Sequence, residues 1–112
     1  MIASELRIGN LICSYSTDVV FKVGKISKNK VNGHLLFDHI QPIQLTEEWL
    51  ERFGFTLINK VDYESNCGTL ELESTDAGFL FDSRIVIKHV HQLQNLYFAL
   101  TGEELTLKQK QQ

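Results

Sequence analysis

The order of the periodic patterns along the chain most constrains its fold. Three stretches with strand character come first, a helical pattern follows, and three more strand-like stretches precede a second helical pattern. Strands and helices therefore do not alternate one by one, as the βαβ units of a parallel sheet would require. The strand-like stretches are residues 6–15, 19–26, 34–40, 55–61, 69–74 and 79–87. We expect an α+β fold, either a mostly antiparallel sheet or a small, partly open barrel, packed with two helices at about residues 46–53 and 90–100.

The first helix has the clearest local signals. Thr46 is a favourable N-cap residue, and Glu47 and Glu48 place negative charge where the helix dipole is positive. Gly54 can adopt the left-handed conformation that follows many helix C-termini. These residues predict a helix of two turns. Beyond the second helix, residues 105–107 fit either a short strand or one more helical turn.

Several turn-forming clusters separate the predicted strands. Asn32-Gly33 supplies the positive-φ positions that a hairpin needs, and Gly9-Asn10 indicates a bulge or turn within the first strand. The sequences around Gly68 and Gly78 have the same turn chemistry.

Composition favours one domain over residues 1–107 and a polar tail over 108–112. The chain has 112 residues, of which 43% are hydrophobic and 22% charged, and a single proline leaves no segment typical of a linker. The N-terminal residues lack the basic and apolar regions of a signal peptide. With only two cysteines and no CxxC spacing, we expect reduced thiols and a cytoplasmic protein.

The second helix lies in a segment without charge, because residues 89–102 contain no Asp, Glu, Lys or Arg. On a helical wheel, His91, Gln94 and Phe98 form one flank of the apolar stripe. Uncharged amides and aromatic rings are typical of surfaces that become buried, where charge is costly. Two interpretations follow: the helix lies inside the domain, or this flank is a surface for self-association or for a partner protein.

Charge is unevenly distributed along the chain, although the formal net charge is only −3. A basic segment contains Lys22, Lys25, Lys28 and Lys30 and no acidic residue. A later acidic stretch contains Asp62, Glu64, Glu71, Glu73, Asp76 and Asp82. Separate faces of opposite charge would favour head-to-tail contacts or a polar partner. The four lysines are also a candidate anion-binding site for a nucleotide or nucleic acid, or simply a solvated hairpin that resists edge-to-edge pairing.

Catalytic and metal-binding patterns are weak. His89 and His91 are two residues apart and would share a face only on a strand, whereas His91 falls at the start of the predicted helix. Cys67 lies in a turn without a recognised nucleophile signature. Phosphate-binding, hydrolase and metalloprotease motifs are missing from the sequence. We therefore expect a non-catalytic protein that binds neither a metal nor a cofactor.

Three segments carry a resemblance to a known group of proteins. They are ELRIGN at residues 5–10, PIQLTEEWLERFGF at 42–55 and HQLQNLYFALTGEEL at 91–105. Together they resemble an uncharacterised family of small proteins from gut anaerobes and their phages and prophages. The resemblance implies a mobile-element setting, in which small proteins often bind host factors, but it supplies no site residues. Our hypothesis is a small protein that binds a protein partner or self-assembles as a homo-oligomer, with nucleotide or nucleic-acid binding as the alternative.

Overall fold

The computed structural model describes residues 6–14, 19–27, 30–33, 35–36, 39–65, 68, 70–82 and 84–107. Within these ranges the chain is an α+β protein with antiparallel strand pairs and two helices. Its contacts divide it into two compact units. Unit 1 contains Met1–Gln44 and His89–Asn95, and unit 2 contains Leu45–Lys88 and Leu96–Gln112. This division does not decide whether the units fold together, so the single domain over residues 1–107 stays a prediction.

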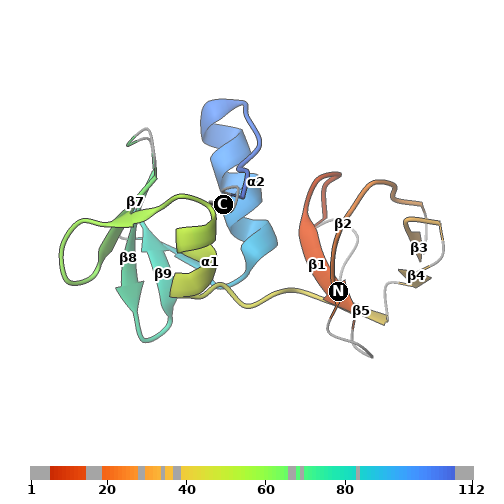
Figure 1. Ribbon diagram of the computed structural model, residues 1–112, viewed down its shortest axis with the longest axis horizontal. Coiled ribbons are helices and arrows are strands. Elements are labelled where there is room, and N and C mark those ends of the chain that lie inside the picture. Colours follow the sequence, from red (N-terminus) through yellow and green to blue (C-terminus); the bar gives the residue numbers. More distant parts are fainter. Residues whose placement is uncertain are drawn as a thin grey trace, which may run out of the picture. The chain divides into compact units, whose positions relative to one another are not determined.

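Unit 1 contains a three-stranded sheet and a separate hairpin (Figure 1). The sheet has the order β2-β1-β5, formed by Val20–Lys22, Leu11–Ser14 and Ile40–Gln41. The hairpin pairs β3 (Lys30–Val31) with β4 (Leu35–Leu36). Its turn begins at Asn32 and Gly33, which both have positive φ, of 57° and 80°. The predicted hairpin turn is therefore confirmed, whereas the single strand expected at 34–40 is wrong because it is divided into β4 and β5.

The buried cluster of unit 1 is small and aliphatic. It consists of Leu6, Ile12, Val23, Val31 and Ile40, with Phe21 and Ile26 packed against it. Ile12 and Ile40 come from paired strands, and each is fully buried. The cluster therefore joins the sheet to the hairpin through Val31.

Unit 2 contains a five-stranded antiparallel meander in the order β10-β9-β8-β7-β6. Its strands are β6 (Thr56–Leu57), β7 (Asp62–Glu64), β8 (Glu71–Thr75), β9 (Gly78–Phe81) and β10 (Ile85–Ile87). Two expected strands are corrected here. The stretch 55–61 contains the β6–β7 turn, where the Asn59 side chain accepts from the main chain of Val61 and Asp62. The stretch 79–87 contains a second turn, in which Asp82 has a φ of 55°.

The first helix, α1 (Glu47–Arg52), forms as the sequence predicts. The Thr46 side chain accepts a hydrogen bond from the Trp49 amide at 3.4 Å, and Gly54 follows the helix with a φ of 89°. An N-cap bond of this kind contributes about 1 kcal/mol. Leu50 is fully buried, while Arg52 stacks over the Trp49 ring at 4.3 Å.

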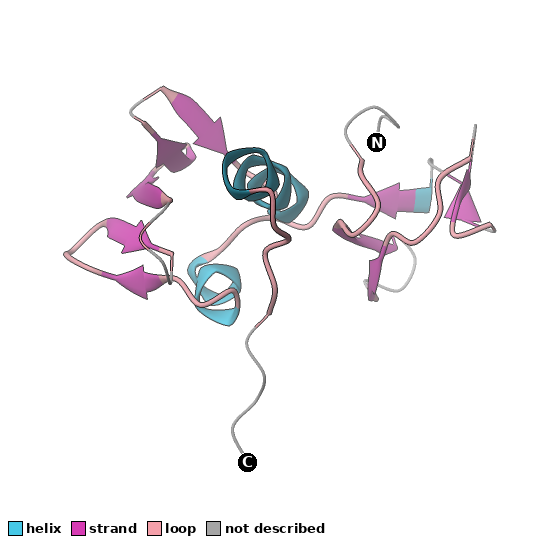
Figure 2. Cartoon of the chain, turned by 90° about the horizontal axis from the view of Figure 1, so that it is seen from above, coloured by secondary structure: helices cyan, strands magenta, loops and turns pink. Residues whose placement is uncertain are grey.

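The second helix, α2 (Val90–Thr101), belongs to both units, since its residues up to Asn95 lie in unit 1 and the rest in unit 2. It ends before Gly102, whose φ is 76°. Figure 2 distinguishes the two helices from the strands. Residues 104–107 form neither a strand nor a helical turn, although Leu105 is buried. The expected polar tail at 108–112 lies outside the described residues.

Candidate functional site

The first half of α2 uses its amide side chains inside unit 1. The Leu11 amide donates to Gln94 Oε1 at 2.8 Å, and Gln94 Nε2 donates to the Gly9 carbonyl at 3.1 Å. The Gln94 side chain thus satisfies two main-chain groups at the start of β1, much as a neighbouring strand would. An unpaired buried donor or acceptor costs about 1–3 kcal/mol, so these bonds matter for the stability of unit 1.

Asn95 extends this contact to the turn before β1. Its Oδ1 atom accepts from Asn10 Nδ2 at 2.9 Å and from Arg7 Nε at 3.1 Å. Arg7 Nη2 also reaches the Gln94 carbonyl at 3.3 Å. Sequence reasoning identified the missing charge of this helix but not Arg7 and Asn10 as its partners, because they lie more than 80 residues away along the chain.

The expected flank of His91, Gln94 and Phe98 is not one exposed surface. His91 is 1% exposed and Gln94 is 2% exposed, so neither is available to a partner. Their burial follows from the packing of the first half of α2 in unit 1, where the His91 ring stacks on His89 at 5.8 Å. The internal interpretation therefore holds for this half of the helix.

The last turns of α2 differ, because apolar residues there reach solvent. Phe98 is 40% exposed and Leu100 is 47% exposed. Phe98 is thus the one member of the predicted flank that a partner could contact. Whether it does so stays a prediction.

The basic segment lies in unit 1. Lys22, Lys25 and Lys30 are exposed, whereas Lys28 lies outside the described residues. Asn32 organises the main chain beneath these lysines: its Oδ1 atom accepts from the amides of Gly24 at 2.8 Å and Lys25 at 3.2 Å. Its Nδ2 atom donates to the Lys22 carbonyl at 3.1 Å. The two amides that could otherwise cradle an anion are therefore already engaged.

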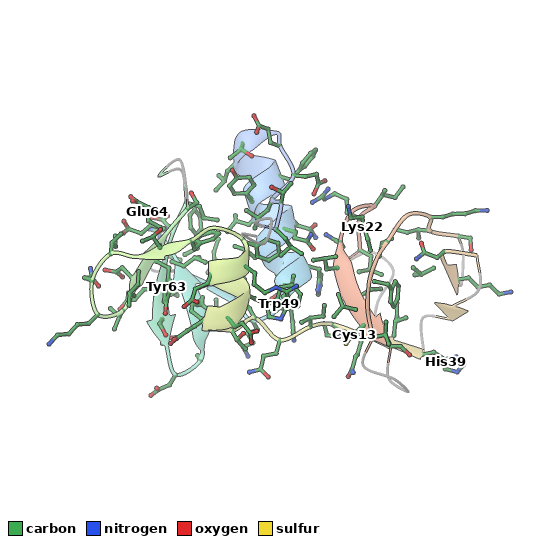
Figure 3. The ribbon with its side chains drawn as sticks, viewed as in Figure 1. Cys13, Lys22, His39, Trp49, Tyr63 and Glu64 are labelled. Atoms are coloured by element: carbon green, nitrogen blue, oxygen red, sulfur yellow. The ribbon has the colours of Figure 1, made fainter. Side chains whose placement is uncertain are left out.

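An acidic face lies in unit 2, on the side of the meander opposite the buried residues Tyr63 and Leu72. Strand alternation places the outward residues of β7 and β8 on this face. These are Asp62 and Glu64 on β7 and Glu71 and Glu73 on β8. Figure 3 labels Lys22 in unit 1 and Glu64 in unit 2.

The strand register places like charges directly opposite each other. Asp62 pairs with Glu73, and Glu64 pairs with Glu71. Like charges in this position destabilise a sheet by roughly 0.2–1 kcal/mol per pair. Sequence analysis found the acidic stretch but not this register, which depends on how β7 and β8 align.

Apolar residues continue the same face across β9 and β10. Leu80 is opposite Glu73, and Val86 is opposite Leu80. One row across four strands therefore reads Asp62, Glu73, Leu80, Val86. We call this the acid–apolar row. An open pocket of about 360 Å³ lies along the face, lined by Asp62, Gly68, Glu71, Glu73, Leu80, Phe81 and Asp82.

The buried side of the meander contains a tyrosine whose ionisation is perturbed. Tyr63 is 4% exposed and meets the Phe79 ring edge-on at 6.0 Å. Burial, followed by the charge of Glu47 and a hydrogen bond with it, raises the pKa of Tyr63 above its ordinary value of 10.0. Glu51 adds a smaller effect in the same direction. The phenol is therefore protonated at neutral pH and links β7 to α1.

Metal-binding clusters are missing from the part of the chain that the structure describes, where no three His, Cys, Asp or Glu side chains converge suitably. The Cys67 turn lies outside that part, so its predicted geometry is untested. Neither described helix has the length and apolar character needed to cross a membrane. Comparison of the chain with protein-family models, curated proteins and solved structures finds no match.

Proposed function

We propose that this chain is a small non-catalytic protein-binding module, and that the outward face of its five-stranded sheet binds a basic, partly apolar segment of a protein partner. The acid–apolar row is the observation that supports this proposal. It places two carboxylates beside two aliphatic side chains on one solvent-facing line of residues. A segment with lysines or arginines beside aliphatic residues is its chemical complement.

The acidic half of the row supplies an electrostatic reason to bind. Asp62 opposite Glu73 is a repulsive arrangement within the free protein. A cationic partner converts this repulsion into attraction between opposite charges. Binding of such a partner is therefore favoured by the strain that it relieves as well as by the new contacts.

The apolar half supplies area that a partner can cover. Val86, on the edge strand β10, is 38% exposed, and Leu80 beside it is partly exposed. Covering apolar surface contributes roughly 25 cal/mol for each Å² removed from water. The pocket of about 360 Å³ is lined in part by Leu80 and offers a concave surface to an apolar side chain of the partner.

Anion binding by the basic segment is the second candidate. The exposure of Lys22, Lys25 and Lys30 supports it. The engagement of the Gly24 and Lys25 amides by Asn32 disfavours it, since phosphate sites commonly use main-chain amides together with lysines. Binding to a nucleotide or oligonucleotide that weakens steeply with salt would support this alternative.

The proposal is tested with a fluorescent peptide of Val-Ser-Lys-Ser repeats, whose valines and lysines lie on the same side of an extended chain. The peptide is titrated with the protein at low salt and followed by anisotropy. We expect saturable binding that weakens as salt rises. The variant Glu71→Lys/Glu73→Lys should bind the peptide at least about tenfold more weakly, a change of about 1.4 kcal/mol.

Glu103→Lys/Glu104→Lys is the matched control, because both residues are exposed in unit 2 and lie outside the sheet. It changes the total charge by the same amount and should reduce affinity much less. Fluorescence of Trp49, the only tryptophan, verifies that α1 is intact in both variants. Equal losses in the two variants, or no binding by the native protein, would contradict the proposal.

A further inference from the structure

We infer that the segment bound by the acid–apolar row is strand β2 of a second copy of this chain. The inference rests on the proposed function and names its partner. It starts from the position of β2 (Val20–Lys22) at the edge of the three-stranded sheet of unit 1. Among the described strands it pairs with β1 alone, which places β2 at the edge of that sheet.

Strand β2 has the chemistry that the row requires. Phe21 packs against the buried cluster of unit 1, so alternation places Val20 and Lys22 together on the opposite side. Val20 is 44% exposed, and Lys22 is exposed as well. An aliphatic residue is thus followed by a cation on one solvent-facing side.

The spacing of these residues fits the row. Alternate residues along a strand are about 7 Å apart, and neighbouring strands of a sheet lie about 4.8 Å apart. A strand lying across the meander with Val20 over Leu80 and Val86 therefore brings Lys22 to Glu73 and Asp62. The nearby acidic pair, Glu64 with Glu71, is then available to the lysines that follow β2.

The part of the basic segment around Lys22 and Lys25 is held in place by bonds within its own unit. Asn32 holds the main chain at Lys22, Gly24 and Lys25 through its side chain, and its amide donates to the Lys25 carbonyl at 2.8 Å. A segment fixed before binding loses less conformational entropy when it binds. This order favours a specific contact over loose electrostatic attraction.

Each copy carries both surfaces, one in each unit. The contact is heterologous, because β2 of one copy meets the acid–apolar row of another. We therefore expect self-association that increases with protein concentration and decreases with salt. The exposed lysines would then have a partner other than a nucleic acid.

The test uses two variants that each remove one surface by neutral substitution. The lysine variant is Lys22→Gln/Lys25→Gln/Lys30→Gln, and the carboxylate variant is Glu71→Gln/Glu73→Gln. Starting from −3, the loss of three positive charges gives −6, and the loss of two negative charges gives −1. Both variants keep a negative net charge, so overall attraction cannot bring them together.

Analytical ultracentrifugation at low salt gives the readout. The native chain should form oligomers at high concentration, each variant alone should remain monomeric, and an equimolar mixture should form a 1:1 complex. The complex is expected because one variant retains its sheet face and the other retains its lysines. Self-association of either variant at the native level, or a mixture that stays monomeric, would overturn the inference.

The same samples separate this inference from the proposed function. A native chain that stays monomeric but binds the valine–lysine peptide through Glu71 and Glu73 overturns the second-copy assignment and leaves the proposed function standing. A native chain that does neither overturns both. A monomer that binds an oligonucleotide through the three lysines overturns the second-copy assignment in favour of anion binding.

Discussion

The two units use their polar side chains in opposite ways. In unit 1, the amides of Asn10, Gln94 and Asn95 turn inward and bond to one another, to Arg7 and to the main chain. In unit 2, the carboxylates on β7 and β8 turn outward and face like charges across the strands. The first arrangement stabilises its own unit, whereas the second costs free energy unless something binds. An uncharged helix can thus signal internal contacts, and a charged sheet face can signal external ones.

The largest effect should come from removing the internal amide. Gln94→Leu leaves the Leu11 amide and the Gly9 carbonyl buried without their partner, which should lower the free energy of unfolding of unit 1 by about 3 kcal/mol. Hydrogen exchange of the Val23 amide, which donates to the Asn10 carbonyl in the same unit, measures the change. Gln44→Leu makes the same substitution at an exposed position of unit 1 and should have little effect. Unchanged protection of Val23 would show that Gln94 does not hold β1.

An intermediate effect should appear in unit 2 at alkaline pH. The folded pKa of Tyr63 is raised, so the unfolded chain releases this proton first. The contribution of Tyr63 to the stability of unit 2 should therefore be constant below about pH 10 and fall as pH rises through the folded pKa. Urea unfolding followed by Trp49 fluorescence from about pH 8 to about pH 11 measures this dependence. Tyr63→Phe should flatten the curve, whereas Tyr97→Phe should not; a native curve without this decline would contradict the expectation.

The smallest effect concerns the outward carboxylates. Glu73→Lys places a cation opposite Asp62 and should raise the free energy of unfolding of unit 2 by about 0.5 kcal/mol at low salt. The gain should shrink as salt rises, because exposed charges are screened. Glu103→Lys changes the net charge equally without a cross-strand partner, so it serves as the control in the same denaturant series. A loss of stability on Glu73→Lys would mean that the like-charge pair is not repulsive.

Sequence analysis predicted the helices better than the strands. Thr46 marks the start of α1 and Gly54 its end, and Gly102 follows the end of α2. These signals could be found in the sequence because helix caps depend on only a few neighbouring residues. The stretches at 55–61 and 79–87 were wrongly predicted as single strands. Asn59 and Asp82 turn the chain at these points, where neither glycine nor proline marks a turn in the sequence. The usual sequence signals of a turn were therefore weak. The antiparallel α+β class was nevertheless correct, since it depends on element order.

The sequence by itself determined the local features of this protein: the capped helix α1, the Asn32-Gly33 turn, the uncharged segment of α2 and the separation of basic from acidic stretches. Only the tertiary structure decided that Gln94 bonds to Leu11, 83 residues away, and that Asp62 faces Glu73. The physical reason is the distance along the chain between the residues that interact. Caps and turns are fixed by neighbouring residues, whereas strand register and helix burial depend on distant segments, and a shift of one residue reverses which side chains face outward.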